Sequence, residues 1–255
     1  MINKSPPSMA SKAIHLLPKA AFSLIELLVV IAVASLLFSM ALPTIGMTRK
    51  AALETRSLGQ LRQIGVAMHS YANDNNNFFP QGYYYQKTDT STVERTYATE
   101  LLPYMSLPTR FFIPEGNPFI SPTSEVPVRT GVNAAFTPFT YSVHGLLCGD
   151  TSLVDRRLKR SAVQRPSEVI LAGDAPQLNN TYATANFSFP PEFNTAGKQT
   201  DLDALIPVGP DTDLQTSRGY LRYRNRGKAA VLMVDGHAEM LKKGEVKYRH
   251  LIADR

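Results

Sequence analysis

The sequence predicts an α+β protein in which one long N-terminal helix packs on an antiparallel β-sheet formed by the C-terminal part of the chain. Three observations lead to this prediction. Residues 22–42 form an uninterrupted apolar run, residues 43–73 continue it with an amphipathic pattern, and residues 228–246 contain two short strand patterns around an Asp-Gly pair. With 255 residues and 44% hydrophobic side chains, the chain is long enough to bury a core beside these elements.

The apolar run has the length of a membrane-spanning helix. Its 21 residues, at a rise of about 1.5 Å each, give roughly 30 Å, which is the thickness of a hydrocarbon core. Such a segment has three possible fates. It is a secretory signal cut near Ser39-Met40-Ala41, an uncleaved signal anchor, or a segment released from a basic leader by cleavage before Phe22. For a membrane-spanning segment we expect the lipid bilayer to be a partner.

Glu26 favours the third fate. An ionised side chain in hydrocarbon costs on the order of a few kcal/mol and should therefore face a partner. No Lys, Arg or His lies between Phe22 and Arg49, so the nearest cation would be an α-amino group created by cleavage before Phe22. That amine would lie four residues upstream of Glu26, which is one helical turn away on the same face. The positive end of the helix dipole also favours a carboxylate in the first turn.

The stretch "AFSLIELLVVIAV" resembles the class III signal of type IV prepilins and type II secretion pseudopilins. The resemblance implies that a prepilin peptidase and methyltransferase cuts after Ala21 and methylates Phe22. It also implies that Glu26 then pairs with the N-terminal amine of a neighbouring pilin subunit, on an inner-membrane assembly platform. The family usually has Gly at the position of Ala21, and we expect cleavage here to be slower.

The resemblance also implies a domain organisation. Residues 1–21 are a cleaved basic leader in the cytoplasm, and residues 22–42 are a transmembrane helix in the bacterial inner membrane. Residues 43–73 continue the helix, and residues 74–255 form a pilin-like head in the periplasm. The assembled product is a periplasmic or cell-surface filament.

Pro43 marks the end of the apolar run. Because proline lacks an N–H group and crowds the preceding turn, we expect the helix either to bend there, as the family resemblance suggests for assembly, or to stop at the membrane interface. An apolar stripe then follows at helical spacing and should end in the Asn-rich stretch before Pro80. Its members are Leu58, Leu61, Ile64, Met68 and Tyr71. We expect His69, beside this stripe, to be a packed or capping side chain rather than a ligand.

The rest of the chain predicts short elements. A short helix is expected in "VERTYATELLPYM", ending before Pro103, and a strand is expected over residues 169–172, closed by Gly173 and Asp174. "GYLRYR" alternates as a strand does, "KAAVLMV" reads as a short buried strand, and Asp235-Gly236 predicts a two-residue hairpin turn.

The stretch "RNRGKAAVLMVDGHAEML" resembles the H-x9-DG motif of a large prepilin-like family. Asp235, Gly236 and His237 match the end of that motif. Asn225 stands at the position of its first His, so the role of that His in the family is not carried over to this chain.

The sequence contains few signs of a metal centre or catalytic site. Asp174, Asp235 and His237 are suitable ligand types, but turn chemistry accounts for Asp235 and Gly236. The pairs Asp201/Asp203 and Asp211/Asp213 could bind calcium, although a solvated acidic loop is the simpler interpretation. The basic residues are scattered and nearly balanced by acidic ones. Beyond residue 21 the chain has 24 basic and 21 acidic residues, which disfavours a nucleic-acid partner.

The sequence therefore predicts a non-catalytic filament subunit with no cofactor. No phosphate-binding loop, nucleophile elbow or zinc-protease helix appears in the chain. The alternative is a membrane-anchored extracytoplasmic binding or hydrolytic domain with an uncleaved anchor. Cys148, the single cysteine, rules out the intramolecular disulfide loop common in pilins and so favours a pseudopilin.

Overall fold

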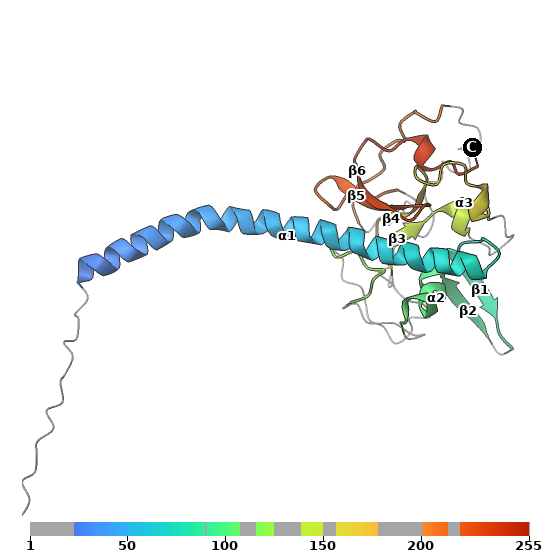
Figure 1. The fold of residues 1–255 in the computed structure, drawn as a ribbon, viewed down its shortest axis with the longest axis horizontal. Coiled ribbons are helices and arrows are strands. Elements are labelled where there is room, and N and C mark those ends of the chain that lie inside the picture. Colours follow the sequence, from blue (N-terminus) through green and yellow to red (C-terminus); the bar gives the residue numbers. More distant parts are fainter. Residues whose placement is uncertain are drawn as a thin grey trace, which may run out of the picture. The chain divides into compact units, whose positions relative to one another are not determined.

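The computed structural model of the protein describes residues 23–89, 91–107, 116–124, 139–149, 157–177, 201–213 and 220–254, without the side chains of residues 41–44 and 94. The chain divides into two compact units, Met1–Thr48 and Arg49–Arg255, and each is described by itself below. Figure 1 shows the order of the elements along the chain.

Helix α1, Leu24–Asp74, contributes to both units. Its helical backbone continues through Pro43, so the expectation that the membrane helix stops there is wrong. Proline removes one backbone hydrogen bond, and the helix continues on both sides of it although Thr44, Ile45 and Gly46 are weaker helix formers than Ala41 and Leu42. In the apolar part, Ser35 and Ser39 donate their hydroxyl hydrogens to the carbonyls of Ile31 and Leu36. These polar side chains therefore need no partner outside the helix.

The second half of α1 buries the predicted apolar stripe. Leu61, Ile64 and Met68 are fully buried, while Leu58 and Tyr71 are half-buried against the same core. The helix ends in the Asn-rich stretch, as predicted. Asn76 and Asn77 adopt positive φ angles of 53° and 64°, and the Asn77 N–H donates to the Ala72 carbonyl at 2.9 Å. Asparagine tolerates this left-handed conformation better than most residues do, which explains why the helix terminates here.

The central sheet is antiparallel, as predicted, and forms a four-stranded meander. Its strands lie in the order β3-β4-β5-β6, so consecutive strands are neighbours (Figure 1). The strands are β3 (Tyr141–Val143), β4 (Ile170–Asp174), β5 (Lys228–Met233) and β6 (Ala238–Lys242). The residues of β5 alternate between two buried clusters, which places one cluster on each face of the sheet.

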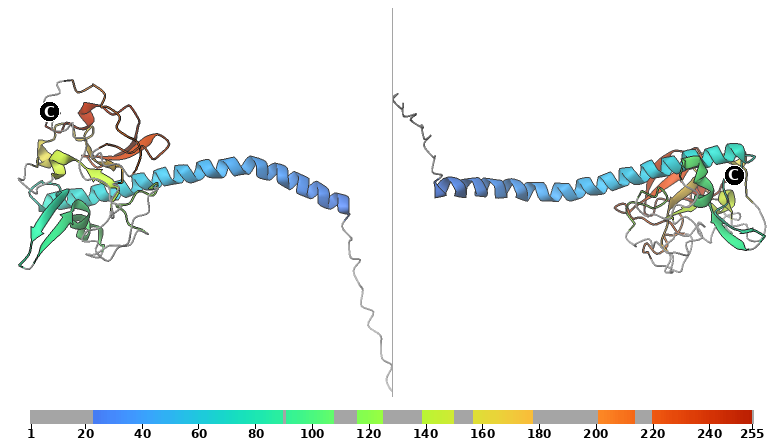
Figure 2. Two further views of the ribbon diagram at one scale, coloured as in Figure 1. Left: turned by 180° about the vertical axis from the view of Figure 1, so that it is seen from behind. Right: turned by 90° about the horizontal axis from the view of Figure 1, so that it is seen from below.

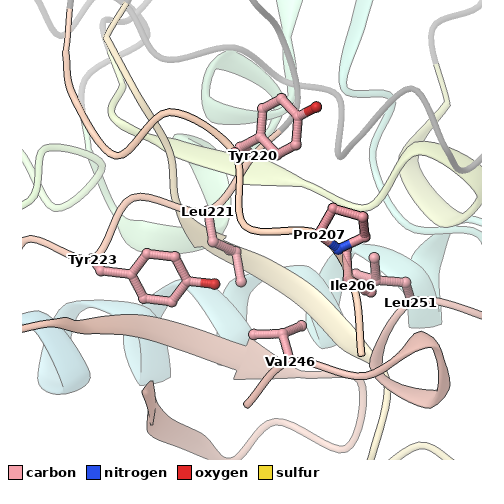
Figure 3. A pocket seen from close by; sticks show the side chains of 8 residues that line it. Ile206, Pro207, Tyr220, Leu221, Tyr223, Val246 and Leu251 are labelled. Carbon is pink, nitrogen blue, oxygen red and sulfur yellow. The ribbon is translucent and has the colours of Figure 1, made fainter. Parts of the chain in front are cut away.

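One face of the sheet packs on α1. Ala230 and Leu232 of β5 belong to the same core cluster as Leu61 and Ile64 of the helix, and the two views of Figure 2 show this half of α1 beside the sheet. The other face is covered by irregular chain. There, residues from 206–209, 220–223 and 246–251 gather around a small pocket (Figure 3). The sheet is therefore buried on both faces.

A separate two-stranded sheet consists of β1 (Tyr83–Lys87) and β2 (Thr92–Thr96), and the short helix α2 (Tyr97–Leu101) follows directly. The predicted helix in this region ends before Pro103, as expected, but its first four residues belong to β2. Thr96 separates the two elements, because its extended backbone ends the strand while its hydroxyl accepts a hydrogen bond from the Thr99 N–H at 3.4 Å.

Three expected boundaries are corrected. Gly173 and Asp174 continue β4 rather than close it, since they pair with Ser142 and Tyr141 of β3. Residues 220–223 alternate in burial but lie outside the strands, and Arg222 makes a single backbone bond to the Asp174 carbonyl at 2.9 Å. The β5–β6 turn closes with the Gly236 N–H on the Met233 carbonyl at 3.0 Å, so Gly236, with φ of 97°, follows the two central residues.

The described part of the second unit contains further short elements. Helix α3, Gly145–Cys148, follows β3, and short 3-10 turns lie at Pro103–Met105, Arg160–Ala162 and Tyr248–His250. His144 caps α3, because its Nδ1 accepts hydrogen bonds from the N–H groups of Leu146 and Leu147 at 3.1 and 3.3 Å.

Candidate functional site

The N-terminal half of α1 is apolar on all sides. The large apolar side chains between Leu24 and Met47 whose placement is described are between 52% and 82% exposed. The most apolar window of 18 residues has a mean hydropathy of 2.5 and none of it is buried, so by length and composition this helix can cross a membrane. A helix of this kind needs a cover of lipid or of other apolar helices.

Glu26 lies at the N-terminus of this helix. Its Oε2 accepts a hydrogen bond of 2.9 Å from the backbone N–H of Ser23, the residue before the helix, and the Leu27 N–H donates to the Ser23 carbonyl at 3.2 Å. This is the glutamate half of a capping box, in which a residue at the third helical position reaches back to satisfy an otherwise free N–H. The carboxylate therefore has a partner within its own chain.

The capping bond between Ser23 and Glu26 is not among the sequence-based predictions, although the sequence contains the signal for it. Ser23 and Glu26 are three residues apart, directly before an apolar run, which is the capping-box pattern. The bond brings the carboxylate to the N–H one residue after Phe22. Ala21 and Phe22 themselves, and the leader before them, lie outside the described residues.

The residues of the C-terminal motif lie at the two ends of β5. Asn225 is buried before the strand, whereas Asp235, Gly236 and His237 form the turn after it. At about 3.3 Å per residue the six residues of the strand span about 20 Å, so the fixed spacing of the motif corresponds to one β-strand. The two ends therefore do not form one site.

At the turn, Asp235 binds His237. Its Oδ1 accepts hydrogen bonds from the backbone N–H and from Nδ1 of His237 at 3.0 and 2.6 Å. Both side chains are more than one-third exposed. Asp174, the third residue suggested as a ligand, is fully buried on β4. Within the described parts of the chain, no group of three or more His, Cys, Asp and Glu side chains is placed to hold a metal ion.

The acidic pairs of residues 201–213 contact basic side chains. Asp203 accepts hydrogen bonds from Lys247 at 2.9 Å and Arg249 at 2.7 Å, and it remains 59% exposed. Asp211 and Asp213 are different, because their side chains are only 16% and 7% exposed. The expectation of a solvated loop is therefore wrong for these two residues. Calcium binding by Asp201 and Asp203 stays a prediction.

Two arginines that were not singled out in the sequence explain the burial of Asp211 and Asp213. Arg222 binds Asp211 at 2.7 Å, and Arg224 binds Asp213 at 2.6 Å and the Ala175 carbonyl at 2.7 Å. The alternating Arg-x-Arg of this stretch was visible in the sequence, but the acidic partners lie 11 residues earlier in the chain. Only the folded backbone brings them together.

His69 is a packed side chain, as expected. Its Nδ1 accepts a hydrogen bond from Arg160 at 3.1 Å, and its ring meets the ring of Phe79 edge-on with the centroids 5.7 Å apart. Burial and the neighbouring Arg160 guanidinium both lower the pKa of His69. Arg160 also binds the side chains of Asn73 and Asn77, so this cluster holds the C-terminal end of α1.

Comparison with known protein families gives one match. The family model described as "Prokaryotic N-terminal methylation motif" matches residues 17–42, the segment that contains Ala21, Phe22 and Glu26. The match supports a class III signal and a prepilin-like protein. Such a motif implies processing by a prepilin peptidase and assembly with pilin-type subunits, and the apolar helix is consistent with anchoring in the inner membrane. No curated protein and no solved structure matches the chain.

Proposed function

We propose that this protein is a non-catalytic filament subunit of a type IV pilus or a type II secretion pseudopilus. The precursor is cut after Ala21, methylated on Phe22, and assembled through the helix that begins at Leu24. The observation that supports this proposal most directly is the combination of exposed apolar side chains along the N-terminal half of α1 with a carboxylate held at its N-terminus. The lone Cys148, which is buried, favours a pseudopilin over a disulfide-containing pilin.

The geometry suggests how Glu26 acts in assembly. In the precursor, Oε2 of Glu26 accepts the Ser23 N–H and satisfies one polar group at the start of the helix. Cleavage before Phe22 creates a cationic amine one residue from that N–H. In an apolar surrounding a carboxylate and an amine attract each other far more strongly than in water. Glu26 is then able to receive the amine of a neighbouring subunit, while lipid or the helices of other subunits cover the apolar side chains.

The mature N-terminus tests this proposal. The chain should be extracted from bacterial membranes, with and without a co-expressed prepilin peptidase, and its intact mass and N-terminal peptide measured. We expect an N-methylated Phe22 only in the presence of the peptidase. A chain that retains Met1, or that begins near Leu42, would instead support the uncleaved anchor or the secretory signal.

Replacement of Glu26 separates its two roles. Glu26→Gln retains an oxygen that can accept the Ser23 N–H but carries no charge, whereas Glu26→Ala removes both. If the ion pair drives assembly, both variants should remain in the membrane and fail to enter filaments. Ser39→Ala, a change in the same apolar helix, is the matched control and should assemble normally.

The rival interpretation is a membrane-anchored binding or hydrolytic domain. An anchored domain of that kind would tolerate Glu26→Ala without loss of its activity or its location. Wild-type levels of Glu26→Gln in isolated filaments would argue that Glu26 serves only as a helix cap. Separately, labelling of filaments with an antibody to residues 74–255 would distinguish a type IV pilus from a type II secretion pseudopilus.

A further inference from the structure

A polar groove lies between the β1–β2 hairpin and helix α2, in the second unit. Its volume is about 250 Å³. Most of the side chains that line it are polar and come from three consecutive elements of the chain. They are Tyr84, Gln86, Arg95, Thr99 and Glu100, with Leu102 and Pro103 at one end.

The pairing of the two strands explains why these side chains converge. Tyr84 and Arg95 are directly opposite each other in the antiparallel register, so they project from the same face of the hairpin. Gln86 lies two residues after Tyr84 and shares that face. Since α2 begins immediately after β2, its first turns bring Thr99 and Glu100 to the same side.

Two hydrogen bonds hold these side chains in place. The Tyr84 hydroxyl donates to Oε1 of Glu100 at 2.7 Å, and Nε of Arg95 donates to Oε1 of Gln86 at 2.9 Å. Each bond uses one end of a forked group. Among the described residues, the other carboxylate oxygen of Glu100, the Gln86 amide nitrogen and the two terminal nitrogens of Arg95 remain for a ligand.

We propose that this groove binds a neutral saccharide. Arg95 and Glu100 line the same groove with opposite charges. Glu100 would repel a strongly anionic ligand, and Arg95 would repel a strongly cationic one. Forked donors and acceptors instead match pairs of neighbouring hydroxyl groups, and a tyrosine ring offers a flat apolar surface to the C–H face of a sugar ring. The groove is smaller than the roughly 300–1,000 Å³ of pockets for drug-sized ligands. It therefore holds one sugar unit, and we infer that the neighbouring units of a longer chain contact the protein surface beside the groove.

Titration of the full chain tests the proposal. The protein should be placed in phosphatidylcholine nanodiscs, which contain no sugar, and titrated calorimetrically with cellohexaose, chitohexaose and maltohexaose and with the corresponding free monosaccharides. We expect at least one hexasaccharide to bind with a millimolar or lower dissociation constant. Binding of a hexasaccharide at least tenfold more tightly than of its monosaccharide would identify a polysaccharide rather than a free sugar as the ligand class.

Substitutions on the two faces of one strand locate the site. Tyr84→Ala and Arg95→Ala should weaken binding at least tenfold. Tyr85→Ala is the matched control, because Tyr85 lies on the opposite face of β1, is 52% exposed and contacts Tyr83 rather than the groove. Equal loss in Tyr85→Ala would overturn the proposal, as would tighter binding of an extended hexapeptide or the lack of binding by every saccharide.

Nuclear magnetic resonance of the wild-type protein provides a second test that does not depend on the folding of a variant. Saccharide should shift the backbone amides of Tyr84, Arg95 and Glu100, and shifts confined to other segments would contradict the assignment. The inference does not depend on filament assembly. A Glu26→Ala chain that stays in the membrane should bind saccharide as the wild type does, so the failure of one proposal can be told from the failure of the other.

Discussion

The side-chain amide of Asn225 donates a hydrogen bond of 3.0 Å to Oδ2 of Asp174, and both residues are buried in the core of the second unit, Arg49–Arg255, which is called the head below. The Ala230 N–H donates to the same oxygen at 3.2 Å. Burial raises the pKa of the Asp174 carboxyl, against the opposing influence of nearby Arg224. The position that holds histidine in the resembling motif thus provides, in this chain, a partner for a buried carboxyl group on β4.

Asn225→Ala should destabilise the head. The substitution removes one of the two donors to Oδ2 and leaves a buried polar group less satisfied, which costs about 1–3 kcal/mol in the free energy of unfolding. Urea denaturation of the full chain, followed by near-ultraviolet circular dichroism, would measure the change. Gln63→Ala, at an exposed position on α1, should stay within about 0.5 kcal/mol of the wild type. A similarly small effect of Asn225→Ala would show that the bond contributes little.

Arg224 and Arg226 should differ strongly although they are two residues apart. The Arg224 side chain is 1% exposed and pairs with the buried Asp213, so Arg224→Met should cost up to about 3–5 kcal/mol, because it leaves Asp213 with only the more distant Arg222, at 3.5 Å. The Arg226 side chain is 48% exposed and binds Glu54 on α1, so Arg226→Met should cost about 1 kcal/mol or less. The same denaturation experiment compares the two variants. Equal losses would contradict this account of the network.

The head should lose stability in acid because of His144. Its Nδ1 accepts two backbone N–H groups of α3 and its Nε2 meets the Leu251 carbonyl at 2.8 Å, which holds the ring in one neutral tautomer. Burial lowers the pKa of His144 from 6.5 to about 4. Between these values the unfolded chain binds a proton that the folded protein does not bind. Stability therefore falls as the pH drops from 6.5 to 4, by up to about 3 kcal/mol.

Denaturation midpoints at several pH values would test the role of His144. His144→Asn retains an oxygen that can cap α3 but has no titrating ring, so its stability should be lower at pH 7 and depend less on pH between 6.5 and 4. Thr96→Asn is the control, because it changes the N-cap of α2 without removing a titratable group. An unchanged dependence of stability on pH in His144→Asn would show that other groups dominate. His69 and His250 are such groups, because burial also lowers their pKa values.

Larger side chains at two glycines of α1 should change the stability of the protein in opposite directions. A Cβ at Gly59 would have no heavy atom within 4 Å, so Gly59→Ala should stabilise the helix by about 0.5–1 kcal/mol. A Cβ at Gly65 would lie 2.8 Å from Cδ1 of Leu232 on β5, and Gly65→Val should destabilise the head because the larger side chain must displace the fully buried side chain of Leu232. The melting temperature should rise in Gly59→Ala and fall in Gly65→Val. A higher melting temperature for Gly65→Val would contradict the close approach of helix and strand.

Several elements could be predicted from the sequence because their signals are local. The helix was expected over residues 22–73 and is described over Leu24–Asp74, and the β5–β6 hairpin lies at the predicted Asp-Gly pair. Helical periodicity, an apolar run and turn-forming residues all act over a few neighbouring positions. The match to the N-terminal methylation motif rests on the same kind of signal, since residues 17–42 are contiguous.

Other expectations failed where distant segments meet. Residues 219–224 alternate as a strand does, yet the described part of this segment lies against the end of β4 through one backbone bond and forms no ladder. Gly173 was expected to close the strand, but it continues β4, because it pairs with Ser142 of β3. A Cβ at this position would lie 3.0–3.1 Å from the side chains of Leu221 and Val231, which explains why a glycine fits there. Glycine is tolerated inside a strand where neighbouring side chains approach this closely.

The sequence by itself determined the membrane-length helix, the position of Glu26 in its first turn and the presence of a C-terminal hairpin. Only the tertiary structure decided that Asn225 meets Asp174, 51 residues earlier, that Arg222 and Arg224 bury Asp211 and Asp213, and that β1, β2 and α2 enclose a polar groove. The physical reason is the range of the interactions. Periodicity and capping depend on adjacent residues, whereas a buried polar group takes its partner from whichever strand or loop the pairing of the sheet places beside it.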